Sequence, residues 1–195
     1  MITSEYKKQL EQMANRHVFK EKIFFYNDIK DYVEKEKPTS LLDFGCAHGR
    51  LIELLKEDFP NISTMDGYDP GVPQFERLPN KSYDCLISND VIEHIEPAYL
   101  DSTLEKIDSY FERSAWIIIA CYPAKKFLPD GRNAHLTVQH PNWWIDKIQQ
   151  VMKRSTIRES SVIVKNPDSD VISRKTKQIL IPKGQQLELR MILEK

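Results

Sequence analysis

The chain has little cysteine and glycine, and it lacks any long apolar run. Among its 195 residues there are three cysteines, Cys46, Cys85 and Cys121, and six glycines. Because the cysteines are odd in number and scattered, they do not match a disulfide framework or a paired metal motif, and we expect reduced thiols. No apolar stretch approaches the roughly 20 residues that a membrane-spanning helix needs. The N-terminus has no apolar core of a secretion signal, so we expect a cytoplasmic protein with no membrane partner.

A strong charge of either sign is also missing. The chain carries 28 basic and 29 acidic residues, for a formal net charge of -1. This balance argues against a protein that binds nucleic acid through an overall positive charge. Hydrophobic residues make up 41% and charged residues 29% of the chain, which is typical of a globular protein. Its length suits one compact domain.

The histidines show no ligand spacing along the chain. None of the five forms an HExxH or similar motif, so we expect no metal site. The five are His17, His48, His94, His135 and His140.

Apolar periodicity predicts helices and strands in alternating order. The expected helices are residues 3–36 (one helix, or two with a break near 15–17), 49–58, 97–111 and 142–152. The expected strands are residues 40–45, 62–69, 83–88, 115–120, 156–164, 179–181 and 187–193. Residues 70–82, 122–140 and 165–176 are rich in turn-forming or polar residues and are expected to be loops.

This order predicts an α/β fold. Strands and helices alternate until late in the chain, which favours a doubly wound, mostly parallel sheet covered on both faces. The last strands follow one another and predict a C-terminal antiparallel strand or hairpin. We expect a single domain over 1–195, with N-terminal helices at 1–37, a ligand-binding core at 38–121, and a long loop with the C-terminal strands at 122–195.

The most informative segment is a strand that runs into a small-residue turn and a helix. Residues 41–49 read LLDFGCAHG. Gly45 permits a sharp turn and the close approach of a ligand to bare backbone, and Gly49 is expected to let the helix pack tightly on the strand. The N-terminus of that helix offers N–H groups and partial positive charge to an anion.

Two further segments are expected at the same edge of the sheet, because ligands of open parallel sheets bind beyond the carboxyl ends of the strands. Asp69 ends the second strand, where a carboxylate can accept hydrogen bonds from both hydroxyls of a ribose. Ser88, Asn89 and Asp90 leave the third strand and are followed by VIEHI at residues 91–95.

These three segments together resemble the class I S-adenosylmethionine-dependent methyltransferases, in particular the small-molecule type. The resemblance rests on LLDFGCAHG at 41–49, GYD at 67–69 and YDCLISNDVIEHI at 83–95. It covers residues 40–121 well and the C-terminal part only by the order of elements. It implies a Rossmann-like fold, S-adenosylmethionine as cofactor, and methyl transfer to an O or N atom of a small-molecule acceptor.

The resemblance also implies a set of site residues. Asp43 and the turn at 45–49 would hold the methionine end of the cofactor, Asp69 its ribose and Pro70 the adenine side, while 88–90 would line the region of the methionyl amine. His94 is the candidate catalytic base, although the Glu-His pair of this string also orders the pocket floor in the family. The implied cofactor-binding residues are Asp43, Gly45, Cys46, Ala47, His48, Gly49, Asp69, Pro70, Ser88, Asn89 and Asp90.

The chain departs from the family pattern at two places. Ala47 stands where the family often has glycine. The segment between Asp69 and Tyr83 is too short for the helix and strand that family members usually have there, which leaves room for a sheet that is one strand short. The residue that contacts adenine therefore has no clear assignment; Gln74 and Asp66 are the candidates.

Other segments allow two interpretations. Residues 3–36 are expected to cover the edge of the sheet, with a lid or a dimer surface as the alternative. Trp143 and Trp144 are expected to pack the following helix rather than to form an acceptor wall. His135 and His140 lie in the long loop over the expected pocket mouth, where either could approach the acceptor.

Three other functions stay open. A nicotinamide-dependent oxidoreductase is disfavoured because the turn is not G-x-G-x-x-G and no Tyr-x-x-x-Lys pair follows the third strand. A non-catalytic cofactor-binding module is compatible with the short segment at 70–82. Methylation of nucleic acid or protein is a further alternative, although the near-neutral charge disfavours nucleic acid. The sequence leaves open whether the protein is a monomer or a homodimer.

Overall fold

The computed structural model describes residues 2–15, 23–166, 169–174 and 186–195, with the backbone alone described at 165–166 and 169–174. The helices are α1 (Ser4–Asn15), α2 (Tyr26–Glu36), α3 (Arg50–Asp58), α4 (Leu100–Tyr110) and α5 (Pro141–Val151), with short 3-10 turns at Ile92–His94 and Pro97–Tyr99. The strands are β1 (Ser40–Phe44), β2 (Thr64–Tyr68), β3 (Tyr83–Asn89), β4 (Phe111–Ala120), β5 (Thr156–Asn166), β6 (Ser169–Arg174) and β7 (Gln186–Glu194).

The strands of the described residues form one sheet in the order β2-β1-β3-β4-β7-β5-β6. β2, β1, β3 and β4 run parallel, whereas β7 is antiparallel to both β4 and β5, and β6 is antiparallel to β5. This confirms the predicted α/β fold with a parallel core and an antiparallel C-terminal part. Residues 69–82, all of which are described, form turns without a strand or helix, so β2 is the edge of the sheet.

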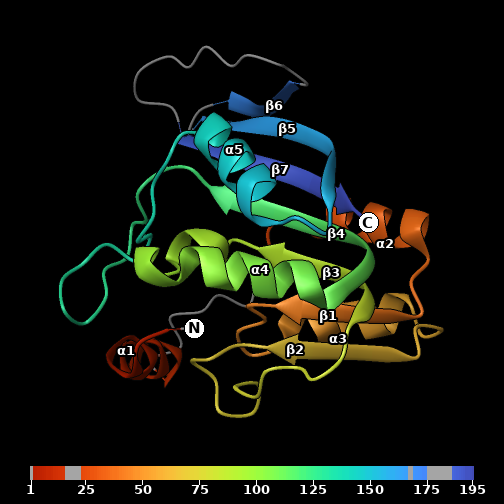
Figure 1. Cartoon of the computed structure of the whole chain (residues 1–195), viewed down its shortest axis with the longest axis horizontal. Coiled ribbons are helices and arrows are strands. Elements are labelled where there is room, and N and C mark those ends of the chain that lie inside the picture. The colour runs from red at the N-terminus through yellow and green to blue at the C-terminus, as the bar shows by residue number, and fades with distance from the viewer. Residues whose placement is uncertain (1, 16–22, 167–168, 175–185) are drawn as a thin grey trace.

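Helices cover both faces of the sheet (Figure 1). The alternation of side chains along each strand sends neighbouring residues to opposite faces. Leu41 of β1 packs with α2 and α3, whereas Leu42 packs with α4 and α5. Trp116 and Ile117 of β4 divide in the same way. Two apolar layers therefore cover the sheet, one on each face. The loops at its carboxyl edge begin from strands that are fixed by this packing.

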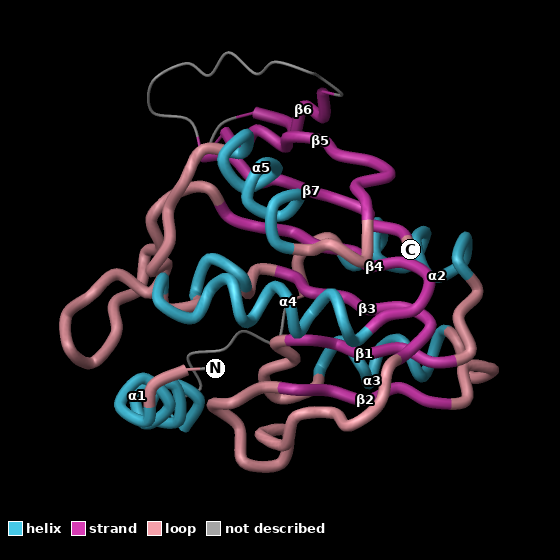
Figure 2. The backbone as a smooth tube through the Cα atoms, in the orientation of Figure 1, coloured by secondary structure: helices cyan, strands magenta, loops and turns pink. Residues whose placement is uncertain are grey.

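The first helix lies elsewhere than expected. Figure 1 shows α1 beyond the carboxyl ends of the parallel strands, on the same side as the loop at 122–140, and Figure 2 shows the same position of α1 in the backbone trace. Tyr6 and Met13 of α1 form a small buried cluster with Leu128 and Ala134 of that loop. The interpretation of this helix as a cover for the sheet edge is wrong, since its apolar face packs on a loop at the rim; α2 packs on a face of the sheet.

Other elements agree with the sequence analysis to within a few residues, except that β4 begins at Phe111 rather than at 115 and that two segments differ. The expected N-terminal helical region consists of two helices, with the positions between 16 and 22 outside the described residues. The polar stretch at 165–176 contains β6, so the expectation of a loop was wrong there. The expected strand at 179–181 lies outside the described residues. Among the helices that are described, none has the length and apolar character to span a bilayer.

Candidate functional site

The turn between β1 and α3 is built on left-handed backbone and is anchored to the end of β2. The carbonyl oxygen of Tyr68 accepts hydrogen bonds from the backbone N–H of Gly45 at 2.7 Å and of Cys46 at 3.1 Å. Gly45, Ala47 and Gly49 have φ values of 89°, 46° and 82°. Ala47 therefore adopts at some steric expense a conformation that glycine takes freely.

The two glycines of the turn face side chains from other loops. A Cβ added to Gly45 would lie 2.3 Å from Cγ2 of Val91, which follows β3. A Cβ added to Gly49 would lie 2.8 Å from the ring of Phe75 in the loop at 69–82. Gly49 is thus required by its backbone conformation and by Phe75, which corrects the expectation that it serves packing of the helix on the strand.

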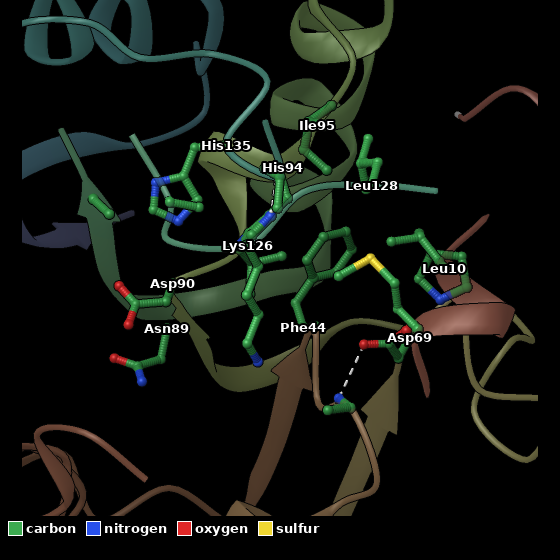
Figure 3. Close-up of a pocket in the computed structure, with 18 of the residues that line it drawn as sticks. Leu10, Phe44, Asp69, Asn89, Asp90, His94, Ile95, Lys126, Leu128 and His135 are labelled. Carbon is green, nitrogen blue, oxygen red and sulfur yellow. Dashed lines mark hydrogen bonds between the residues drawn. The ribbon is translucent and has the colours of Figure 1, made fainter. Parts of the chain in front are cut away.

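Asp69 joins the β1–α3 turn to the loop that follows β2. Its Oδ2 accepts a hydrogen bond from the Ala47 N–H at 3.0 Å, and its Oδ1 accepts one from the Gly71 N–H at 2.9 Å. Figure 3 shows Asp69 in the wall of the pocket, with the bond to the turn drawn as a dashed line. Burial raises the pKa of this carboxyl, and the two hydrogen bonds oppose the rise.

A cavity of about 600 Å³ lies at the carboxyl edge of the sheet. All three predicted loops reach it. The expected site residues that line it are Gly45, Ala47, Asp69, Pro70, Asn89, Asp90 and His94. Their role in cofactor binding stays a prediction.

The other expected cofactor residues lie beside the cavity rather than in its wall. Asp43, Cys46 and Ser88 are buried, and His48 and Gly49 lie at the far end of the turn. Burial, reinforced by the nearby charge of Asp69, raises the pKa of Asp43 to about 7. Asp43 therefore shapes the electrostatics of the turn from behind the wall.

The opposite wall comes from α1 and the connection at 122–140, which the sequence analysis named only as a possible lid and as the loop over the pocket mouth. The amphipathic pattern of α1 was visible, but nothing local showed which surface its apolar face would cover. The additional lining residues include Ile2, Tyr6, Leu10, Met13, Phe24, Tyr122, Lys125, Lys126 and Leu128. The two candidates for adenine contact do not line the cavity; Asp66 instead accepts a hydrogen bond from the Tyr83 hydroxyl at 2.8 Å and pairs with Lys81 at 3.0 Å.

Two histidines meet in the wall near the end of β3. The rings of His94 and His135 lie edge to face with their centroids 4.8 Å apart. Burial lowers the pKa of His94 to about 4, with further contributions from His135 and Lys126, so its imidazole is neutral at neutral pH. Nε2 of His135 lies 4.0 Å from Oε1 of Glu93, a carboxylate that is fully buried.

The remaining candidates in the long connection serve α5. Nδ1 of His140 accepts a hydrogen bond from the Asn142 N–H at 3.1 Å, so His140 caps the helix. Trp144 is fully buried in the core, and Trp143 packs against it edge to face. This confirms the packing interpretation of the two tryptophans.

A model of the family described as "Methyltransferase domain" matches residues 14–166 of the chain. The chain belongs to this methyltransferase domain family. The match spans the sheet core, all three loops of the candidate site and the connection that carries His135. No curated protein matches the sequence significantly.

Solved structures with a similar fold include several methyltransferases. An N1-methyltransferase from Burkholderia thailandensis, bound to 1,6-didemethyltoxoflavin and S-adenosylhomocysteine, has a TM-score of 0.56 at 14% identity over 98% of this chain and 89% of its own. A protein from Nostoc punctiforme assigned as an O-methyltransferase has a TM-score of 0.52 at 15% identity over 93% of this chain. Coclaurine N-methyltransferase, bound to N-methylheliamine and S-adenosylhomocysteine, has a TM-score of 0.52 at 12% identity over 71% of this chain.

These likenesses concern the fold alone. The methyltransferase domain described here spans 59% of the Nostoc protein and 49% of the coclaurine enzyme. At identities of 12–15% these proteins share the fold with this chain, whereas their acceptors belong to each protein separately.

We expect Gly45→Ala to destabilise the methyltransferase domain in two ways. The positive φ alone is unfavourable for alanine by roughly 1–2 kcal/mol, and the new methyl group meets Val91. Gly131→Ala is the matched control, since Gly131 has a φ of 88° with nothing within 4 Å of the added Cβ. Urea unfolding should show a larger loss of unfolding free energy for Gly45→Ala than for Gly131→Ala. The double variant Gly45→Ala/Val91→Ala should lose less of the extra amount, because it lacks the two Val91 methyl groups that the added Cβ meets. Equal losses at both glycines would contradict the close contact.

We expect Asp43 to make the stability of the fold fall as the pH rises. Its folded pKa of about 7 lies above the ordinary aspartate pKa of 3.8, so the folded state binds more protons than the unfolded state between these values. Asp43→Asn should therefore gain stability relative to the wild type from about pH 4 to about pH 7, up to roughly 4 kcal/mol. Urea unfolding at several pH values measures this difference, and a difference that does not vary with pH would contradict the raised pKa.

Proposed function

We propose that this domain transfers a methyl group from S-adenosylmethionine to an O or N atom of a small-molecule acceptor. The observation that carries the proposal is the meeting of three loops at one cavity, through Gly45, Asp69 and Asn89. Membership of the methyltransferase domain family implies use of this cofactor. The acceptor and the role of each residue are our inference from the geometry.

The residues present fit the cofactor. The cavity of about 600 Å³ lies within the usual range of roughly 300–1,000 Å³ for small-molecule sites. Each carboxylate oxygen of Asp69 has two lone pairs, so it can hold the backbone of the turn and still accept a ribose hydroxyl. We assign the methionyl end to the backbone of the turn at 45–49. Pro70 with Leu10 and Met13 of α1 supplies an apolar wall for the adenine.

The cofactor, when bound, supplies a methyl group on a cationic sulfonium, which is already activated for transfer. The chain has to align an acceptor atom with that group, and orientation of this kind is worth roughly 7–11 kcal/mol in favourable cases. Asp69 and the partly ionised Asp43 provide negative potential near a cation. The apolar wall excludes water from the reacting atoms.

The walls favour a small acceptor. α1 and the connection at 122–140 close over the cavity through the cluster of Tyr6, Met13, Leu128 and Ala134. An acceptor that enters the cavity beneath them has to be small or be presented as a narrow end of a larger molecule. The near-neutral charge of the chain agrees with this inference, and two of the similar structures hold small molecules.

His94 is better suited to positioning than to removing a proton. Its lowered pKa makes it a weak base, and a base of this kind contributes little to deprotonation of a hydroxyl. An acceptor nitrogen with a lone pair needs no base. We therefore assign His94 to the wall that orients the acceptor.

We expect Asp69→Asn to weaken binding of S-adenosylhomocysteine by tenfold or more. The substitution removes a charged acceptor of hydrogen bonds to the ribose and loosens the turn at Ala47. Asp66→Asn is the matched control, because this carboxylate lies three residues earlier, on β2, and contacts Tyr83 and Lys81 rather than the cavity. Isothermal titration calorimetry measures both, and equal affinities in the two variants would remove Asp69 from the site.

The reaction is tested by following a labelled methyl group. The protein is incubated with S-adenosylmethionine labelled at the methyl group and a metabolite extract, and label is measured in the small-molecule, protein and RNA fractions. We expect label in the small-molecule fraction, and much less with Asp69→Asn. Binding of S-adenosylmethionine without transfer of the label would support a non-catalytic module. Label in the protein or RNA fraction would show that the acceptor is a macromolecule and not a small molecule. Tighter binding of NAD than of S-adenosylmethionine would overturn the proposal.

A further inference from the structure

Three side chains with metal-ligating atoms meet at the wall of the cavity. Glu93 and His94 come from the 3-10 turn after β3, whereas His135 comes from the connection between β4 and α5. One ligand atom from each lies within 4.8 Å of the other two. Figure 3 shows the imidazoles of His94 and His135 side by side in the pocket wall. The cluster is therefore formed by tertiary structure and opens toward the ligand.

Backbone hydrogen bonds fix the tautomer of both histidines. Nδ1 of His94 lies 2.7 Å from the Ala134 carbonyl oxygen, and Nδ1 of His135 lies 2.5 Å from the Tyr122 carbonyl oxygen. A carbonyl only accepts, so each Nδ1 carries the proton and each Nε2 carries the lone pair. Metal-binding histidines typically donate their other ring nitrogen to a carbonyl or carboxylate in this way. The two rings are thus held in orientation by the backbone.

The carboxylate of the cluster is buried and held in place. Glu93 has no exposed surface, and its Oε1 accepts a hydrogen bond from the Ala120 N–H at 3.1 Å. The cavity wall also contains Asp90 and two cationic side chains, Lys125 and Lys126. Glu188 is buried behind the wall, where its Oε1 accepts a hydrogen bond from the Tyr122 hydroxyl at 3.0 Å. Glu93 is the carboxylate that lies within reach of both histidines.

We propose that Glu93, His94 and His135 bind a divalent first-row transition cation at the acceptor end of the cavity. Two neutral imidazoles and one carboxylate are a donor set for such metals, and three protein ligands leave positions open. Ligand atoms about 2.0–2.2 Å from a metal lie closer together than the present cluster, so binding draws the three side chains inward. The expectation of no metal site considered only spacing along the chain, and it could not include a histidine from a distant loop.

The coordination positions that the protein leaves open on the cation suggest a role in catalysis. This role rests on the proposed methyl transfer. His94 and His135 line the cavity, so the remaining coordination positions face its interior. An acceptor oxygen would occupy one, and an acceptor with two adjacent oxygens would bind as a chelate. The site would thereby select oxygen acceptors and hold the reacting oxygen in place.

The test is cation binding by the full chain after treatment with a chelator. Co²⁺ is titrated into the protein and followed by calorimetry and by its visible absorption, which reports nitrogen and oxygen ligands. We expect one Co²⁺ per chain, and at least tenfold weaker binding in Glu93→Gln and in His135→Gln. Glu93→Gln keeps a carbonyl oxygen for the Ala120 N–H. His140→Asn is the control, because asparagine preserves the helix cap and His140 lies outside the cluster.

S-adenosylhomocysteine binding and circular dichroism are measured on the same samples. Absence of Co²⁺ binding by the wild type, or equal binding in wild type and both cluster variants, would overturn the cation site while leaving the proposed function intact if S-adenosylhomocysteine still binds. Co²⁺ binding without S-adenosylhomocysteine binding would support the site and contradict the proposed function. If Glu93→Gln does not fold, His135→Gln decides. His135 lies at the cavity wall, whereas Glu93 is fully buried, so the histidine is the more tolerant position.

Discussion

The carboxylate of Asp69 is the interaction on which the geometry of the site depends. It accepts hydrogen bonds from Ala47 and Gly71 and so ties the turn after β1 to the loop after β2. The Tyr68 carbonyl next to it holds Gly45 and Cys46. Because these contacts lie at the end of the edge strand, they replace the support that a further strand would give. Without them the turn would have little to define its left-handed backbone.

Buried acidic groups give the cavity its electrostatic character. Asp43 and Asp69 have raised pKa values because burial disfavours their charged forms, and the charge of Asp69 adds to the rise at Asp43. Glu93 lies fully buried on the other side of the cavity. Positive charge placed near these carboxylates is stabilised by them. A sulfonium at one end and a divalent cation at the other would both be consistent with this constraint.

The parallel core and the meeting of its loops could be predicted because the signals are local. A buried strand, a glycine turn and an apolar helix follow one another between 40 and 58, and the carboxyl ends of parallel strands share an edge. The position of α1 could not be predicted, since an amphipathic helix fits equally on a sheet face or on a loop. The adenine candidates failed for a similar reason: Asp66 lies on the edge strand, where Tyr83 and Lys81 compete for its carboxylate.

The sequence by itself determined the order of strands and helices, the sharp turn at Gly45 and the family of the chain, because each depends on residues that are close along the backbone. Only the tertiary structure decided which side chains line the cavity. His135 reaches His94 because the connection after β4 folds back over β3, and Leu10 reaches Gly71 because α1 crosses the rim. Contacts of this kind arise from the closing of long loops, for which no local pattern exists.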